Sequence, residues 1–581
     1  MAVQLPPPFV QRMQQLLGTE FEDFIRSYEQ SPRAGLRVNT LKISNEQFRE
    51  ISPFDLRPIP WCETGYYINA DARPGKHPYY YTGLYYIQEP SAMSPVEALQ
   101  VQPGDRVLDL CAAPGGKSTQ IAAALQGQGL LVTNDLSAER TRALAKNMEL
   151  YGVRNAVILN ESPDRIAEKF NGFFDKILVD APCSGEGMFR KDDDAARQWL
   201  NHSVEKCAIM QKDILQTVAR MLAPGGRIVY STCTFAPEEN ERSIAVFLDN
   251  HPHFQVTRPV GSEHFRSGRS DWAEMVEQEL AAGQSVLNEM AAHAPVSQAS
   301  LKQTADTVRL WPHHLEGEGH YIAVLDDMSD SSSIQSSPAD GMERYEDRLQ
   351  RHHEIDERAS VHDHDERSGK QKRDERKDSS GRRREYEQQS HAKHGRGKRA
   401  MQDSHHLSTT GNGKKGKVGR GNSTSLPADI TDGVELWHQF RDSECSSSFR
   451  QPQGSHIITY GSNLYLSPLD ESCLQGLKVI RPGWYLGSHK KGRFTPGHAL
   501  AVALSPSEAS RIVHLDSRLP EAISYLKGET LSIPEQRVQC SEGVSARGYV
   551  LVCIDGYSAG WGKWQQDGNL KNEYPAGWRW M

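Results

Sequence analysis

Between residues 103 and 231 the chain alternates short apolar runs with longer amphipathic stretches. The apolar runs predict strands at 103–110, 130–134, 157–160, 176–180 and 227–231. The stretches between them repeat apolar positions at helical spacing, notably over 138–151 and 204–222, and predict helices. Because strands and helices alternate, we expect an α/β fold with a mostly parallel sheet that is covered on both faces.

Chemically active side chains follow the carboxyl ends of two of these strands. Asp180 closes one strand and Cys183 comes shortly after it, while Cys233 follows the strand at 227–231. Open α/β sheets bind ligands at the carboxyl ends of their strands. We therefore expect two cysteines and an aspartate to meet over one crevice.

A loop of small residues joins the first of these strands to a helix expected over 119–126. Small residues there let a ligand approach the backbone and the N-terminus of the helix. Asp135 ends the next strand, twenty residues beyond Gly115, where nucleotide-binding folds place an acid for the ribose hydroxyls. A dinucleotide site is the competing interpretation, and it is weakened because the pattern is Pro-Gly-Gly rather than Gly-x-Gly-x-x-Gly.

The N-terminal region has a different pattern. Apolar positions at helical spacing predict two short helices before residue 35, and a strand follows on which Arg37 and Asn39 share one face. On a half-buried strand such side chains are usually solvated. Residues 61–86 are dense in aromatic and basic side chains, which either stack unpaired bases or pack as an ordinary β-rich segment.

A hairpin is predicted at the end of the α/β region, from 307–311 and 319–325, with His313 and His314 between its strands. The neighbouring sequence offers no carboxylate constellation for a metal. We therefore expect surface or packing roles for both histidines and no metal site.

Residues 326–428 are almost free of apolar side chains, and this composition predicts disorder because such a segment buries too little surface to offset its ordering entropy. Its stretch 367–399 holds 13 Lys or Arg against 5 Asp or Glu, a local net charge of +8. The segment either reaches phosphates non-specifically or is only a tether. From residue 430 onward, alternating runs predict a small β-rich domain with interleaved aromatic and cationic residues at its end.

The composition narrows the class of protein. A length of 581 residues indicates several domains, and a net charge of -8 would not by itself suggest nucleic acid. Nine cysteines without a Cys-x-x-Cys pair are typical of a reducing compartment and give little support to structural zinc. The N-terminus has no secretory pattern and no apolar run reaches the length of a membrane span, so we expect a cytoplasmic protein that does not enter membranes.

Three blocks of sequence, at 108–117, 180–187 and 231–234, resemble the signature blocks of the Sun-type RNA (cytosine-5) methyltransferases. Further agreement at 37–39, 83–93 and 187–191 is similar to the bacterial ribosomal RNA branch of that family, the RsmF group. The resemblance covers about residues 1–325 and 430–581 and leaves out the charged segment between them.

The resemblance implies a Rossmann-like class I methyltransferase sheet, a small N-terminal α+β domain and a C-terminal β-rich PUA-like domain. We accordingly expect four regions: an N-terminal RNA-binding and packing domain at 1–95, an S-adenosylmethionine-dependent catalytic domain at 96–325, a disordered charged linker at 326–428, and a PUA-like RNA-binding domain at 429–581.

It further implies transfer of a methyl group from S-adenosyl-L-methionine to carbon 5 of a cytidine in ribosomal RNA of the small subunit, the 16S RNA. Carbon 5 of cytosine is a poor nucleophile, so a thiolate first adds to carbon 6 and pushes electrons toward carbon 5. A free thiol is only slightly ionised at neutral pH, so this cysteine needs an activating setting.

By resemblance, Cys233 is the nucleophile, Cys183 assists product release, and Asp180 hydrogen-bonds the ring nitrogen or exocyclic amine of the cytosine. The residues alone do not decide which cysteine is the nucleophile and which assists release, since cytosine-5 DNA methyltransferases use a Pro-Cys nucleophile. The cofactor-binding residues implied are Cys111, Ala112, Ala113, Pro114, Gly115, Gly116, Lys117, Asp135 and Asp180.

Two smaller assignments stay open in the sequence. The contact to adenine falls somewhere in 160–162, where Ser162 takes the aligned position. Arg190 and Lys191 match a basic family position that either meets RNA phosphate or is solvated.

The expected partner is ribosomal RNA, free or within the small subunit, and the expected state is a monomer. Two alternatives remain: a transfer RNA cytosine-5 methyltransferase, and a non-catalytic RNA-binding factor for ribosome assembly. Loss of either cysteine would have favoured the second alternative, and both cysteines are present.

Overall fold

The computed structural model describes residues 5–191, 193–199, 204–282, 295–329 and 428–580, and these belong to one structural unit. The segment predicted to be disordered, 326–428, lies outside the described residues except at its two ends.

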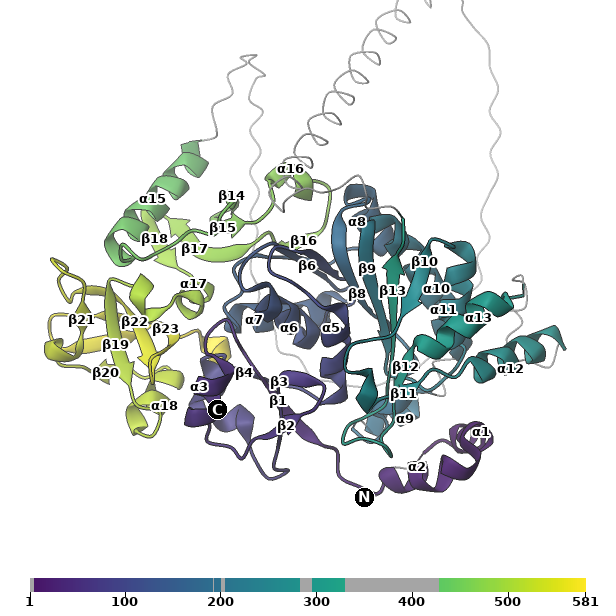
Figure 1. Cartoon of the computed structure of the whole chain (residues 1–581). Helices are drawn as coiled ribbons and strands as arrows, with labels where there is room; N and C mark the ends of the chain where they lie inside the picture. Colours follow the sequence, from purple (N-terminus) through teal and green to yellow (C-terminus); the bar gives the residue numbers. More distant parts are fainter. Residues whose placement is uncertain (1–4, 192, 200–203, 283–294, 330–427, 581) are drawn as a thin grey trace, which may run out of the picture. The chain divides into compact units, whose positions relative to one another are not determined.

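A ten-stranded sheet forms the centre of the fold, in the order β11-β12-β13-β9-β8-β5-β6-β7-β16, with β10 paired to β13 (Figure 1). Its strands are β5 (Arg106–Asp109), β6 (Leu130–Asn134), β7 (Ala156–Leu159), β8 (Phe174–Asp180), β9 (Leu222–Thr232), β10 (Phe254–Thr257), β11 (Arg266–Ser267), β12 (Val308–Leu310), β13 (His320–Asp327) and β16 (Val479–Arg481).

The inner five strands, β7-β6-β5-β8-β9, are parallel. The chain runs outward from β5 through β6 to β7 and then crosses to β8 and β9, which creates a topological switch point between β5 and β8. This is the expected Rossmann-like α/β sheet. Strands β10 to β13 extend it with antiparallel pairs, including the hairpin predicted around His313 and His314.

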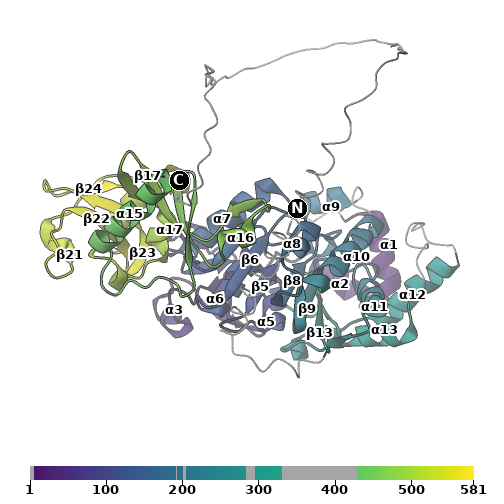
Figure 2. The same ribbon diagram turned by 90° about the horizontal axis from the view of Figure 1, so that it is seen from above.

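Helices cover both faces of this sheet (Figure 2). One face carries α5 (Ser94–Leu99), α6 (Gly116–Leu125) and α7 (Ala138–Leu150), whose apolar side chains share one core cluster with the sheet, and the other carries α8 (Pro163–Lys169), α10 (Val204–Met221) and α11 (Glu241–Asn250), which pack together. Helix α7 begins after Ser137, whose hydroxyl accepts the N–H of Arg140 and caps the helix. Helix α6 begins at Gly116, three residues before the predicted start, so the glycine loop leads directly into the helix. The remaining helices of this region are α9 (Asp193–Trp199), α12 (Ser270–Ala281) and α13 (Gln298–Gln303).

The N-terminal region holds the two predicted helices, α1 (Pro7–Leu17) and α2 (Phe21–Ser27), and a four-stranded antiparallel sheet in the order β2-β3-β1-β4. Its other elements are β1 (Ala34–Val38), α3 (Asn45–Ile51), β2 (Arg57–Ile59), β3 (Cys62–Ile68), α4 (Pro78–Tyr81) and β4 (Tyr85–Ile87). The aromatic segment is largely core, since Tyr66, Tyr67, Tyr79 and Tyr85 are buried. For these four rings the packed alternative is correct.

The expectation that Arg37 and Asn39 are solvated is wrong. Each is only 2% exposed, because polar groups from distant segments satisfy it. The Arg37 guanidinium donates to Thr119 Oγ1 at 2.7 Å and to Gln88, while Asn39 Nδ2 donates to the carbonyl of Gly83 at 2.8 Å. Arg37 thereby ties the N-terminal sheet to α6, next to the glycine loop.

The C-terminal region begins with α15 (Ala428–Glu444) and contains two further sheets. The first has the order β14-β15-β17-β18, built from β14 (His456–Tyr460), β15 (Asn463–Ser467), β17 (Trp484–Lys490) and β18 (Arg493–Pro496). The second has the order β20-β24-β23-β22-β19-β21, built from β19 (Arg511–Leu515), β20 (Leu531–Ser532), β21 (Gln539–Cys540), β22 (Gly548–Ile554), β23 (Tyr557–Trp564) and β24 (Asn569–Asn572). Three short helices, α16 (Glu471–Leu474), α17 (His498–Ala503) and α18 (Pro520–Leu526), complete the β-rich region that the sequence predicts.

The C-terminal region also supplies β16, which pairs antiparallel with β7 at the edge of the central sheet. Trp561 and Trp564 are core residues, whereas Lys490, Lys491 and Arg493 are exposed. Among the residues the structure describes, no helix combines the length and the apolar character that crossing a membrane requires.

Candidate functional site

The carboxyl ends of β8 and β9 bring the two predicted cysteines together. Asp180 lies opposite Ser231 in the parallel register of these strands, so the loops that follow leave the sheet at the same edge. Cys183 Sγ and Cys233 Sγ are 3.4 Å apart, and the N–H of Gly187 donates to the carbonyl of Cys233 at 2.8 Å. Both cysteines are half-buried free thiols.

Asp180 is anchored beside the cysteines by two donors from different elements. Lys117 Nζ, on α6, lies 2.8 Å from Asp180 Oδ2, and Ser231 Oγ donates to Oδ1 at 2.9 Å. Burial has the largest effect and raises the pKa of Asp180, but the Lys117 charge, the neighbouring His320 and the hydrogen bonds from Lys117 and Ser231 together lower it more, so the net pKa lies below the usual value. Asp180 is therefore a carboxylate at neutral pH.

Cys183 is held as a thiol by its surroundings. Its hydrogen bond with Cys233 and its burial both raise the pKa of Cys183 well above the usual value. A protonated Cys183 can donate its S–H toward the sulfur of Cys233, which would stabilise negative charge there.

The glycine loop lies at the same edge of the sheet, between β5 and α6. The N–H of Ala112 donates to the carbonyl of Asn134 at 2.8 Å, and the N–H of Ala113 donates to Asp135 Oδ2 at 3.2 Å. Gly115 has a φ of 111°, which an L side chain rarely adopts. The loop residues 111–117 and Asp135 thus form one connected cradle, although the ammonium of Lys117 lies on Asp180.

Two features show that this cradle fits a nucleoside ligand. The buried acceptors Asp109 Oδ1 and Asn160 Oδ1 have no hydrogen-bond partner among the described residues. Leu136 follows Asp135 and is 72% exposed, so a flat apolar ring can pack on it. Asn160 Nδ2 donates to the carbonyls of Asp135 and Leu136, at 2.7 and 3.0 Å, and so joins this edge.

His320 is a site residue that the sequence analysis did not single out. It begins β13, is 5% exposed, and its Nε2 lies 4.0 Å from Asp180 Oδ1. Burial lowers the pKa of His320 to about 4, so the ring is neutral at pH 7. Its strand was predicted, but its proximity to Asp180 depends on the antiparallel pairing of β13 with β9, which local pattern does not reveal.

Arg190 is not available for RNA phosphate or for solvent. It is 8% exposed and forms an ion pair with Glu318 at 3.0 Å, while its terminal nitrogens donate to the carbonyls of Ser27 and Gly317. Lys191 beside it is exposed. Of the two basic residues, Arg190 is therefore a buried packing residue and Lys191 is a surface residue.

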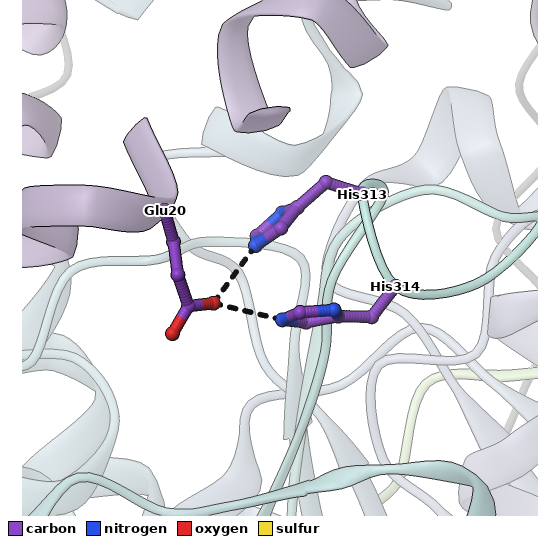
Figure 3. A group of neighbouring side chains, drawn as sticks. All are labelled: Glu20, His313 and His314. Atoms are coloured by element: carbon purple, nitrogen blue, oxygen red, sulfur yellow. Dashed lines mark hydrogen bonds and ion pairs between the residues drawn. The ribbon is translucent and has the colours of Figure 1, made fainter. Parts of the chain in front are cut away.

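A carboxylate does lie beside His313 and His314, contrary to the expectation from the neighbouring sequence. Glu20, from the turn between α1 and α2, accepts from Nε2 of both rings, at 3.2 and 2.8 Å (Figure 3). Arg266 donates to Nδ1 of His314 at 3.4 Å, and because a guanidinium only donates, the proton of a neutral His314 is on Nε2. With both rings donating to Glu20, these hydrogen bonds join the N-terminal helices to the hairpin loop.

Family models match four consecutive parts of the chain. Residues 96–326 match 16S rRNA methyltransferase RsmB/F, and residues 5–90 match the N-terminal domain of 16S rRNA methyltransferase RsmF. In the C-terminal region, 439–504 match the RsmF rRNA methyltransferase first C-terminal domain, and 512–580 match the methyltransferase RsmF PUA domain.

Individual proteins agree with this pattern. The chain is 44% identical over 254 residues to ribosomal RNA small subunit methyltransferase F of Vibrio campbellii, covering 41% of this chain and 52% of the relative. It is 41% identical over 284 residues to the protein of that name from Erwinia tasmaniensis, covering 47% of this chain and 59% of the relative. The chain thus spans about half the length of the curated relatives it matches.

Among solved structures, a methyltransferase homolog protein from Pyrococcus horikoshii is 29% identical. The match covers 56% of this chain and 96% of that one, with a TM-score of 0.45.

Proposed function

We infer from these four matches that the chain belongs to the RsmB/F family of 16S rRNA methyltransferases, and from this premise we propose that it methylates carbon 5 of a cytidine in small-subunit ribosomal RNA. The methyl donor is S-adenosyl-L-methionine, which supplies an electrophilic methyl group on a sulfonium. The observation that carries the proposal is the meeting of Cys183, Cys233 and Asp180 at one sheet edge, beside the glycine loop.

The cofactor would be held by the loop 111–116, by Asp135 and by Leu136. Asp135 offers its remaining carboxylate lone pairs to the ribose hydroxyls, as acids at this position do in nucleotide-binding folds. Leu136 offers the exposed apolar surface for the adenine, and Asn160 offers its unpartnered Oδ1 as an acceptor.

Cys233 is the nucleophile. Its thiolate adds to carbon 6 of the cytosine, and the electrons of the carbon 5–carbon 6 double bond move to carbon 5, which then accepts the methyl group. Cys183 keeps its proton and donates it toward Cys233, an arrangement supported by the raised pKa of Cys183. A thiol in this place can favour the thiolate of Cys233 before attack and meet it again at release.

Asp180 and Lys117 act on the ring of the target base. Asp180, ionised beside Lys117, accepts a hydrogen bond from the exocyclic amine or the protonated ring nitrogen and so makes carbon 6 a better acceptor of the thiolate. After methyl transfer the proton on carbon 5 is released to solvent, its bonding electron pair reforms the carbon 5–carbon 6 double bond, and the carbon 6–sulfur bond breaks with its electron pair returning to Cys233.

The assignment of Cys183 to release is tested by Cys183→Ala. We expect this variant, incubated with S-adenosylmethionine and small-subunit RNA, to accumulate a protein–RNA adduct that survives denaturation. Gel electrophoresis of radiolabelled RNA measures it, with Cys207→Ala, a buried cysteine on α10, as the matched control. A Cys183→Ala enzyme that methylates without any adduct contradicts the assignment.

A further inference from the structure

The loops that carry the two cysteines are joined by two buried carboxyl groups that the reaction itself does not use. Glu186 comes three residues after Cys183, and its Oε2 accepts from the N–H of Phe235 and the hydroxyl of Thr234, both at 3.0 Å. Those two donors immediately follow Cys233. Glu186 thus reaches from the Cys183 loop to the Cys233 segment.

Glu239 makes the reverse connection. It lies on the segment that follows Cys233, and its Oε2 accepts the N–H of Ser184 at 3.0 Å, the residue directly after Cys183. Each cysteine loop therefore contributes a glutamate that holds the backbone of the other loop. We call Glu186 and Glu239 the carboxyl clasp.

Gln211, on α10, completes the hold on Cys183. Its Nε2 donates to the carbonyl of Pro182 and to Glu239 Oε2, both at 2.9 Å. The residues on either side of Cys183 are thus bonded to the same pair of side chains. The hydroxyls of Ser184 and Thr234 lie 2.7 Å apart and bridge the two loops directly.

Glu186, Glu239 and Gln211 are buried, so none of them is a solvated surface group. Glu186 is 1% exposed, and Glu239 and Gln211 are 0% exposed. Burying a carboxyl group is unfavourable unless it is neutral or well hydrogen-bonded. Burial, together with Glu186 nearby, raises the pKa of Glu239 to about 8, so it is largely a neutral acceptor at pH 7. Cys183, Cys207, Tyr230 and Arg12 are further titratable groups close enough to interact with Glu239.

We propose that Glu186 and Glu239 are positioning residues that hold the sulfurs of Cys183 and Cys233 within hydrogen-bonding distance of each other. Both glutamates act through the cysteine loops: Glu186 holds Thr234 and Phe235, and Glu239 holds the N–H of Ser184. The catalytic consequence rests on the proposed function, whereas the separation of the sulfurs can be measured without it.

The separation is tested with phenylarsine oxide, which binds two neighbouring thiols through two arsenic–sulfur bonds with release of one water. Intact mass measures how fast one arsenical is bound by the wild-type protein, and Cys183→Ala identifies the fraction due to this pair. We expect Glu239→Ala to slow that binding by about tenfold or more, since small displacements of paired groups have large effects. Glu239→Gln keeps an acceptor oxygen for Ser184 and Gln211, so it should bind like the wild type.

Exposed Glu279 on α12 provides the matched control, Glu279→Ala. If Glu239→Ala does not fold, Gln211→Ala removes the donor to Pro182 and Glu239 and should slow binding in the same direction. The proposal is overturned if Glu239→Ala and Gln211→Ala bind the arsenical as fast as Glu279→Ala does. It is also overturned if Glu239→Gln binds the arsenical as slowly as Glu239→Ala.

Methylation of small subunits from cells that lack the enzyme gives the second readout. Glu239→Ala should reduce methyl incorporation and accumulate the denaturant-stable adduct, and Glu239→Gln should restore release. If the wild type incorporates no methyl group, the proposed function fails, while the arsenical measurement still decides whether the clasp holds the cysteines.

Discussion

At the scale of single residues, the site depends on a cation placed next to an acid. Lys117 and Asp180 are 63 residues apart in sequence, and their side chains meet because α6 follows the carboxyl end of β5, the strand that pairs with β8 at the switch point of the sheet. The Lys117 side chain is 11% exposed and that of Asp180 is 32% exposed, so water screens the pair only in part. The cation keeps Asp180 ionised despite its burial.

Replacing Lys117 by methionine tests this role. Without the cation the pKa of Asp180 rises, so the acidic limb of the pH–activity profile should move to higher pH, and activity at neutral pH should fall by roughly tenfold or more. The shift of the acidic limb is measured by methyl incorporation at a series of pH values between about pH 5 and pH 8. Lys302→Met, at an exposed lysine on α13, should leave the limb in place. An unshifted limb in Lys117→Met would show that Lys117 does not control Asp180.

The positions of the reactive residues could be predicted from the sequence, whereas the hydrogen-bond and ion-pair partners of buried charged residues could not. Asp180, Cys183 and Cys233 follow strand ends, and the carboxyl edge of a parallel sheet brings such residues together whatever their separation in sequence. Arg37 and Arg190 were misjudged because charged residues are usually exposed, and only the tertiary structure supplies Gln88, Thr119 and Glu318 to satisfy them.

At the scale of elements, the Cys183 loop packs so closely against Gly319 and the Cys233 segment that one of its positions excludes a side chain. A Cβ added at Gly187 would lie 2.6 Å from the carbonyl oxygen of Gly319 and 3.0 Å from that of Cys233. Both neighbours are backbone atoms, which cannot rotate away. The turn after Cys183 therefore requires glycine for its contact with the Cys233 segment.

Gly187→Ala should separate the loops and impair both stability and turnover. We expect a loss of about 1–3 kcal/mol, the usual effect of overpacking, and a fall in methyl incorporation of at least roughly tenfold. Thermal unfolding and single-turnover methylation measure the two effects. Gly577→Ala is the matched control because its added Cβ meets nothing within 4 Å. Equal activity in the two variants would contradict the close packing of the loops.

The elements with strong local patterns were predicted well. Strand β6 has the predicted bounds, and α7 and α10 each end within one residue of prediction. Pairings between strands that are distant in sequence could not be predicted. Strand β16 has three residues, and its partner, β7, lies more than 300 residues earlier in the chain. The local pattern of β16 does not indicate which strand it pairs with.

At the scale of the molecule, the C-terminal region contacts the central sheet region through side chains as well as through β16. Arg154 donates to both carboxylate oxygens of Glu508, at 3.0 and 2.6 Å, and its guanidinium stacks on Trp484. Arg481 pairs with Glu149 of α7 at 2.6 Å. Burial raises the pKa of Glu508, but the Arg154 hydrogen bond and charge lower it further, so the net pKa lies below the usual value.

Arg154→Ala should destabilise this contact by about 2–5 kcal/mol at neutral pH, since it leaves Glu508 partly buried without its partner. A carboxyl group with a lowered folded-state pKa contributes stability above its unfolded pKa and loses it as the pH falls through the folded value. The difference between variant and wild type should therefore shrink toward acidic pH. Thermal unfolding of the full chain at neutral and acidic pH measures this, and a difference independent of pH would contradict it.

The central claim is that Cys233 attacks the base, and Cys233→Ala tests it most directly. Small subunits from cells lacking the enzyme are incubated with methyl-labelled S-adenosylmethionine, and the nucleosides are then separated by mass. We predict labelled 5-methylcytidine with the wild type and none with Cys233→Ala. Labelled 5-methylcytidine formed by Cys233→Ala at a rate near that of the wild type would contradict the account.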